Sequence, residues 1–202
     1  MFLYLVDLLG TSIFAISGVA LAFRLRMDAV GVLVLASVTA IGGGTIRDLV
    51  LDVPVFWLSN NAYIWVVIIT CILMIIFVKK PAKVPWYILP VSDAIGLAFF
   101  TIMGTEKSLQ LGFTPTVAVI MGALTGCGGG VIRDVLAREI PLIFRKEIYA
   151  TASIIGGSIY CLLSMYHVSR IIDVIVAIIA VLIIRLASIK WQLSLPTFGQ
   201  SR

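Results

Sequence analysis

Residues 42–48 read GGGTIRD, and residues 128–134 read GGGVIRD. Each stretch places three consecutive glycines and an Arg-Asp pair inside an otherwise apolar segment. A glycine in a helix interior costs roughly 1 kcal/mol relative to alanine. A charged side chain near the bilayer centre costs about 2.5 to 3.5 kcal/mol on insertion scales. The doubled pattern therefore indicates more than a set of helices that simply span a membrane.

The composition of the whole chain is that of an integral membrane protein. Of its 202 residues, 61% are hydrophobic and 12% are charged, and the mean hydropathy is +1.14. A membrane-spanning helix needs about 20 mostly apolar residues. The sequence predicts an all-α protein with one transmembrane domain over residues 1–202 and seven spans, near residues 3–23, 30–52, 62–79, 87–104, 115–137, 148–166 and 171–189.

An internal repeat relates the two glycine stretches at an offset of 86 residues. The same offset relates several other positions: Asp7 to Asp93, Gly10 to Gly96, Phe14 to Phe100, Gly18 to Gly104, Thr39 to Thr125 and Tyr63 to Tyr149. Three spans per repeat is an odd number, so the second copy enters the membrane from the opposite side. We expect two inverted repeats, at about 3–79 and about 87–166, followed by an extra helix at about 171–189.

The basic residues predict the orientation in the membrane. Eleven of them fall on one side of the seven spans: Arg24, Arg26, Lys79, Lys80, Lys83, Arg138, Arg145, Lys146, Arg185, Lys190 and Arg202. Only Lys107 and Arg170 fall on the other side, with Arg47 and Arg133 inside the membrane. Because basic residues concentrate in cytoplasmic segments, we expect the N-terminus outside and the C-terminus in the cytoplasm.

The glycine triplets predict a pathway through the membrane. Three successive glycines leave a helix poorly supported and its backbone uncovered, so the second and fifth spans are expected to kink or unwind there, lining a pore. The expected lining residues are Gly42, Gly43, Gly44, Thr45, Gly128, Gly129, Gly130, Thr39 and Thr125. Two alternatives stay open: the glycines permit close helix packing, and the threonines bond to their own helix.

The buried charges suggest how the pathway is lined. Neighbours at i and i+1 do not face each other on a helix, so Arg47 and Asp48 are not expected to pair. Topology instead predicts two ion pairs, Asp7 with Arg47 and Asp93 with Arg133. Four carboxylates, which include Asp48 and Asp134, then face two guanidinium groups. The net charge of −2 favours cations, and the alternative is that these charges only stabilise the fold.

Other residues have simpler interpretations. The aromatic residues near span ends are expected to form the interfacial belt: Trp57, Tyr63, Trp65, Trp86, Tyr87, Tyr149, Tyr166 and Trp191. The three cysteines are expected to be small buried residues, and His167 a loop residue. The sequence has no catalytic constellation, no cofactor motif and no structural metal site. The charge of +5 reflects membrane orientation rather than nucleic-acid binding.

The doubled GGGxIRD motif, the length and the seven spans resemble the prokaryotic branch of the trimeric intracellular cation (TRIC) channel family. The resemblance covers about residues 3–190. It implies a homotrimer with one pore per subunit, passing monovalent cations, chiefly K⁺, between two helices kinked at residues 42–44 and 128–130. Animal members are similar in carrying a basic residue near the fifth-helix glycines, associated with voltage and lipid control; here the nearest cation is Arg133.

The sequence therefore supports three hypotheses. The first is a K⁺ channel, with Na⁺ as another possible permeant ion, in the inner membrane of a prokaryote and surrounded by lipid. Bacterial relatives with this motif are linked to uptake of small amino acids, so the second is a secondary transporter for a small zwitterion such as glycine. The third is a structural or lipid-contacting trimer without transport.

Overall fold

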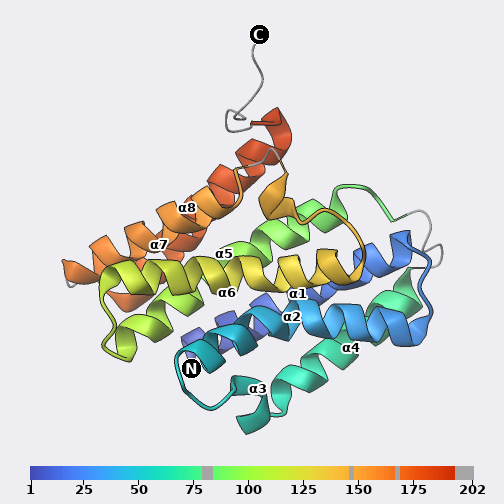
Figure 1. The fold of residues 1–202 in the computed structure, drawn as a ribbon, viewed down its shortest axis with the longest axis horizontal. Coiled ribbons are helices and arrows are strands. Elements are labelled where there is room, and N and C mark those ends of the chain that lie inside the picture. The colour runs from blue at the N-terminus through green and yellow to red at the C-terminus, as the bar shows by residue number, and fades with distance from the viewer. Residues whose placement is uncertain (79–83, 146–147, 167–168, 194–202) are drawn as a thin grey trace.

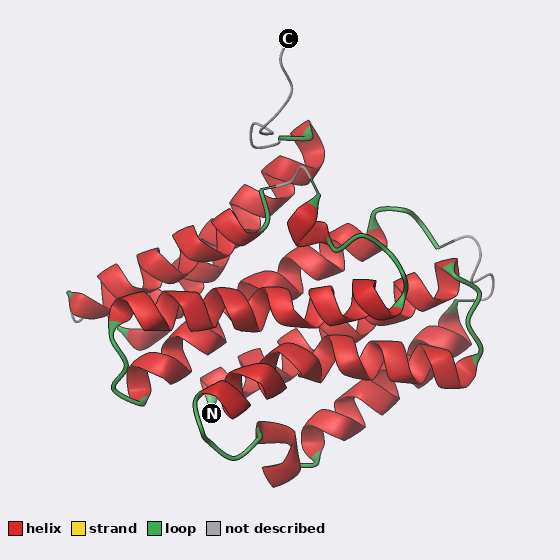
Figure 2. Ribbon diagram, viewed as in Figure 1, coloured by secondary structure: helices red, strands yellow, loops and turns green. Residues whose placement is uncertain are grey.

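The computed structural model describes residues 1–78, 84–145, 148–166 and 169–193, which form helices and turns and contain no strand (Figure 2). Five helices are long and apolar enough to cross a membrane: α1 (Phe2–Arg24), α2 (Ala29–Val50), α5 (Ile88–Gln110), α6 (Pro115–Leu136) and α8 (Arg170–Trp191). Four elements are shorter: α3 (Phe56–Ser59), α4 (Ala62–Phe77), η2 (Leu142–Phe144) and α7 (Ala150–Met165). The chain is a multi-pass membrane protein.

Each of the seven predicted spans overlaps one helix, which is one of the five long helices or the shorter α4 or α7. The largest difference is in α5, which continues to Gln110 instead of ending near 104, because its last turns are polar yet packed against neighbouring helices. The short helices α3 and η2 are not predicted. Several residues used to predict the orientation, or assigned to a loop, lie outside the described residues: Lys79, Lys80, Lys83, Lys146, His167 and Arg202.

Helices α1, α2, α5 and α6 form the centre of the molecule (Figure 1). Helix α4 packs against α1 and α2. On the opposite side α7 packs against α5 and α6, and α8 packs against α5 and α7. One apolar core surrounds Phe14 and a second surrounds Leu97. The Phe14 and Phe100 rings pack together within the first core, with centroids 5.2 Å apart. The antiparallel pair α2 and α6 lies across this centre.

Helices α2 and α6 end in the same way. Asp52 and Arg138, just after the two helices, have left-handed φ angles of 53° and 57°. The following amides bond back to the helix, Val53 N to Asp48 O at 3.0 Å and Glu139 N to Asp134 O at 2.9 Å. Such a cap stops a helix and turns the chain sharply. In both cases the turn returns the backbone to the aspartate at the helix end.

Candidate ion pathway

The middle glycines of the two triplets bring α2 and α6 into backbone contact. A Cβ added at Gly43 would lie 2.1 Å from the carbonyl oxygen of Thr125, and one added at Gly129 would lie 2.2 Å from that of Thr39. Any side chain at either position would push the helices apart. The two contacts are equivalent under the 86-residue offset.

Three of the four outer glycines face side chains of other elements, and the fourth, Gly128, faces the Gly43 backbone, with 3.2 Å between an added Cβ and the Gly43 Cα. A Cβ at Gly42 would lie 2.8 Å from the Ile132 side chain, and one at Gly44 would lie 2.6 Å from the Phe56 ring. In the second triplet, a Cβ at Gly130 would lie 3.0 Å from the Tyr149 hydroxyl. Successive helical residues point about 100° apart. Three adjacent glycines therefore admit three different close neighbours, so close packing accounts for all three glycines of a triplet.

The sequence predicted that the second and fifth spans kink or unwind at the glycines, and they do not unwind. Helix α2 is continuous from Ala29 to Val50, and α6 from Pro115 to Leu136. The expectation that the helices unwind was wrong because it considered glycine only in an isolated helix. Here the surrounding packing favours the helix and outweighs the low helix propensity of glycine. The same close packing is confirmed elsewhere: a Cβ at Gly18 would lie 2.6 Å from the Ala36 Cα.

The threonines at the crossing bond to their own helices. The hydroxyls of Thr39, Thr45 and Thr125 donate to the carbonyl oxygens four residues earlier, at 2.6, 2.7 and 2.6 Å. This is the alternative that the sequence left open. Thr45 also accepts a hydrogen bond from Trp57 Nε1 at 3.0 Å. The backbone carbonyls of Thr39 and Thr125 are the groups that lie against Gly129 and Gly43 at the crossing.

In each motif the arginine forms an ion pair with the aspartate that follows it, contrary to the prediction. Nε of Arg47 donates to Oδ1 of Asp48 at 2.7 Å, and Nε of Arg133 donates to Oδ1 of Asp134 at 2.8 Å. The rule for i and i+1 concerns the directions of the Cβ atoms, whereas the long flexible arginine stem can curl back to its neighbour. Both aspartates also cap the chain after the turn described above. Oδ2 of Asp48 accepts from Phe56 N at 2.9 Å, and that of Asp134 from Leu142 N at 3.1 Å.

The first cluster, defined as Asp7, Arg47, Asp48, Tyr63 and Lys107, differs from the prediction. Asp7 forms no ion pair within 4 Å among the described residues, so the proposed pair with Arg47 is wrong. Oδ2 of Asp7 instead accepts a hydrogen bond from the Tyr63 hydroxyl at 2.7 Å. Lys107, expected in an outer loop, reaches from α5 to Oδ1 of Asp48 at 2.7 Å. Arg47 lies over the Phe56 ring at 5.6 Å.

The second cluster, defined as Ser17, Asp93, Arg133, Asp134 and Tyr149, contains the other predicted pair. Nη1 of Arg133 bonds to Oδ1 of Asp93 at 2.7 Å, which confirms that prediction, and also donates to the Ser17 hydroxyl. Both partners are fully buried. A buried arginine with two carboxylates and a hydroxyl has the partners that make such burial tolerable.

Sequence reasoning missed Lys107, Ser17 and the two tyrosines as members of these clusters. Tyr63 and Tyr149 are buried instead of lying in an aromatic belt, and Arg185 is buried over the Tyr149 ring at 4.6 Å. The signal was present for the tyrosines, since they share the 86-residue offset with Asp7 and Asp93. No comparable signal marks Lys107, because its offset partner is Leu21. With Lys107 included, four carboxylates face three cations, and the net charge is −1 rather than −2.

Solved structures with the same architecture decide the family. The chain is 37% identical to the TRIC trimeric intracellular cation channel orthologue from Rhodobacter sphaeroides, with a TM-score of 0.88, and the match covers 95% of this chain and 98% of that one. The chain belongs to the prokaryotic TRIC family. A prokaryotic TRIC channel solved in 0.5 M KCl gives a TM-score of 0.87 at 34% identity, covering 96% of this chain and 99% of that one.

Sequence comparisons place this TRIC family member among bacterial membrane proteins. The family model described as "Glycine transporter" matches residues 4–79 and 90–165. A UPF0126 membrane protein of Vibrio cholerae is 53% identical, covering 99% of this chain and 84% of the relative. The inner membrane protein YadS of Escherichia coli K12 is 51% identical, covering 98% of this chain and 97% of the relative.

Proposed function

We propose that this TRIC family member is a monovalent cation channel that conducts chiefly K⁺ through a pathway within each subunit. The observation that carries the proposal is the pair of charged clusters associated with α2 and α6, the helices that meet at the glycine crossing. Their net charge of −1 attracts cations across a weakly screening interior. The solved TRIC cation channels that this chain resembles support the same conclusion. On this proposal the protein is not an enzyme and needs no cofactor beyond the permeant ion.

We further propose that the Gly43–Gly129 crossing is the constriction. The carbonyl oxygens of Thr39 and Thr125 lie against Gly129 and Gly43 there, and carbonyl oxygens can replace part of the hydration shell of K⁺. The backbones are in contact, so conduction requires α2 and α6 to separate or bend at the triplets. Glycine permits such a movement because it restricts the backbone least.

The proposed architecture is one transmembrane domain of seven spans, with inverted repeats at about 3–79 and about 87–166 and an extra helix at about 171–189. The family model supports this division because it matches twice at a spacing of 86 residues. The equivalent turns, glycine contacts and Arg-Asp pairs of the two halves support it as well. We propose a lipid-embedded homotrimer in the inner membrane, with the N-terminus outside and the C-terminus cytoplasmic.

Planar-bilayer recording of purified protein in a K⁺ gradient tests the function. The expected result is resolved unitary currents that reverse near the K⁺ equilibrium potential, and replacement of K⁺ by Na⁺ at equal ionic strength gives the selectivity. Gly129→Leu should abolish the currents. Protein reconstituted at the same density with Gly157→Ala is the matched control, because the nearest atom to a Cβ there, Thr105 Oγ1, lies at 3.1 Å instead of the 2.2 Å at Gly129. Electrically silent wild-type protein would refute the proposal.

A second candidate function is uptake of a small zwitterion, and the description of the matching family model as "Glycine transporter" favours it. Alternating access at a site between inverted repeats would use the same crossing. Counterflow of labelled glycine in proteoliposomes tests it. Glycine exchange without unitary currents would select the transporter over the channel, and neither activity would leave a structural role.

A further inference from the structure

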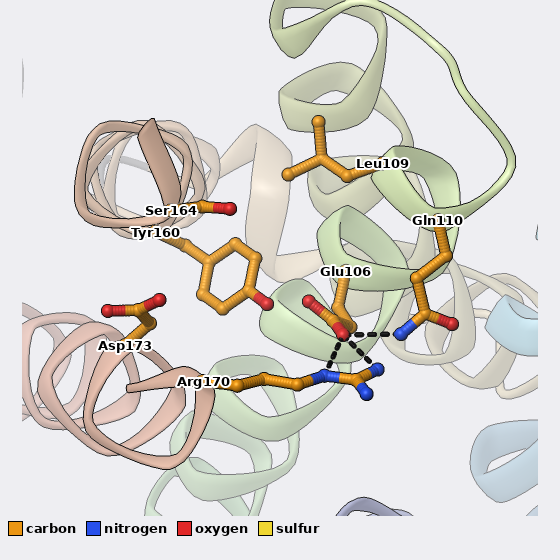
Figure 3. Close-up of a pocket in the computed structure, with 7 residues that line it drawn as sticks. All are labelled: Glu106, Leu109, Gln110, Tyr160, Ser164, Arg170 and Asp173. Atoms are coloured by element: carbon orange, nitrogen blue, oxygen red, sulfur yellow. Dashed lines mark hydrogen bonds and ion pairs between the residues drawn. The ribbon is translucent and has the colours of Figure 1, made fainter. Parts of the chain in front are cut away.

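A pocket of about 500 Å³ lies where the C-terminal end of α5 meets α7 and the start of α8 (Figure 3). It belongs to neither charged cluster. Its lining is polar on most sides and comprises Glu106, Leu109, Gln110, Tyr160, Ser164, Arg170 and Asp173. Such a combination of convergent polar groups in a concave site is typical of small-ligand binding.

Asp173 is the more buried of the two acidic groups of the pocket and forms no ion pair with any of the described residues. Asp173 is 3% exposed, and its Oδ1 is buried with no hydrogen-bond partner among the described residues. It lies in the first turn of α8, where the helix dipole favours a negative charge. The dipole supplies no hydrogen bond to Oδ1, however, so a buried carboxylate oxygen in this pocket lacks a donor.

The other charges of the pocket satisfy one another. Arg170 and Gln110 both turn their nitrogens to Oε1 of Glu106, as the converging dashed lines in Figure 3 show. The Arg170 charge is therefore directed to Glu106 and away from Asp173. Two carboxylates and one guanidinium give the pocket a net charge of −1. A buried charge without a partner is unfavourable, and Asp173 has no counter-ion among the described residues.

The pocket is not inherited from the internal repeat. The positions 86 residues before Glu106, Tyr160 and Ser164 are the apolar Ala20, Met74 and Val78. Helix α8 has no counterpart in the first repeat. Glu106 faces α8, whereas its neighbour Lys107 faces α2. The pocket is thus separated from the proposed pathway by the width of α5.

We propose that this pocket binds a monovalent cation, either an alkali ion or a primary ammonium group, with Asp173 as its counter-ion. The hydroxyl oxygens of Tyr160 and Ser164 are available as further ligands, and Figure 3 shows both on the pocket side of α7. A divalent metal fits less well: the described residues contain no group of three or more His, Cys, Asp or Glu that could hold one. The cavity has room for a partly hydrated ion.

Infrared difference spectroscopy of the purified full-length protein tests this site, because a bound cation shifts carboxylate bands. The protein is perfused with N-methyl-D-glucamine chloride, then with KCl or methylammonium chloride at equal ionic strength. We expect a saturable carboxylate change, and the salt that acts at lower concentration identifies the alkali or ammonium source. Asp173→Asn should weaken the apparent affinity for that band by about tenfold or more. Glu139→Gln, which removes an exposed carboxylate paired with Arg145, should leave the band unchanged.

Several results would overturn the site. One is the same cation-dependent band in Asp173→Asn as in the wild type. Another is a carboxylic acid band in the cation-free protein that disappears with Asp173→Asn and that neither salt alters. If Asp173→Asn does not fold, the double variant Tyr160→Phe/Ser164→Ala serves instead, and an unchanged affinity in it refutes the site. The infrared signal is independent of conduction: a silent wild-type protein would refute the channel and leave this test standing. Asp173→Asn is expected to keep the wild-type unitary conductance.

Discussion

The two charged clusters share one backbone design and differ in their third partner. In both, an arginine pairs with the next residue, and that aspartate caps the chain after the helix. In the second cluster, Arg133 adds a fully buried pair with Asp93. In the first, Asp7 bonds to a tyrosine, and the extra charge is Lys107, whose side chain is 31% exposed. The two helix ends thus share one design, while their surroundings leave one cluster closed and the Lys107 side chain of the other partly exposed.

The largest expected effect separates the two arginines. Arg133→Met leaves Asp93 and Asp134 buried without their cation, and removal of one partner from a buried pair costs about 3 to 5 kcal/mol. Arg47→Met leaves Asp48 with Lys107 and the Phe56 amide, so its cost should be smaller. Thermal unfolding and size-exclusion profiles in detergent measure both. Equal losses would show that the second cluster is no more dependent on its arginine than the first.

The glycine crossing should respond equally in its two halves. Gly43→Ala and Gly129→Ala each place a Cβ just over 2 Å from a carbonyl oxygen, and overpacking of this kind costs about 1 to 3 kcal/mol. We expect similar drops in melting temperature for the two variants, with Gly157→Ala as the control. Clearly unequal drops would mean that the two sides of the crossing relax differently. Gly129→Leu retaining full conductance would remove the crossing from the pathway.

Replacing the two tyrosines should change stability less than the substitutions above, and here the first cluster should lose more stability than the second. Tyr63→Phe removes a buried hydrogen bond to the Asp7 carboxylate and should cost about 1.5 kcal/mol. Tyr149→Phe removes a hydroxyl that has no partner among the described residues, so its stability should hardly change. Both variants keep the aromatic ring, and melting temperature is again the measurement. A greater loss for Tyr149→Phe would contradict the described hydrogen bonding.

Lys107 should affect conduction more than stability. Because its side chain is partly exposed, loss of its pair with Asp48 is expected to cost less than about 1 kcal/mol. Lys107→Met makes the clusters more negative, from −1 to −2, and should raise cation conductance at low salt. Lys107→Arg is the charge-conserving control. The increase should fade at high salt as screening shortens the range of the charge, and a lower conductance in Lys107→Met would show that the lysine supports the open pathway.

The sequence predicted the membrane-spanning helices well because the apolar residues of each helix are consecutive in the sequence. A run of apolar residues specifies a span, and the 86-residue offset relates Asp93 and Arg133 to Asp7 and Arg47 without any coordinates. The sequence predicted the structural role of the glycine triplets less well. Three glycines weaken an isolated helix, and only the neighbours of Gly42, Gly43 and Gly44 show why each lacks a side chain. The sequence could suggest both a break and close packing, but it could not choose between them.

By itself, then, the sequence determined a helical membrane protein of the TRIC family with a duplicated glycine and Arg-Asp motif. Apart from the Asp93–Arg133 pair, tertiary structure alone decided which charges meet. Asp48 and Lys107 are 59 residues apart and come from different halves of the chain, and Arg133 reaches Ser17 across 116 residues. Composition and the 86-residue offset describe patterns along the chain. Partners that belong to no repeat are set by how the helices pack, because a specific neighbour stabilises a buried charge in a low dielectric.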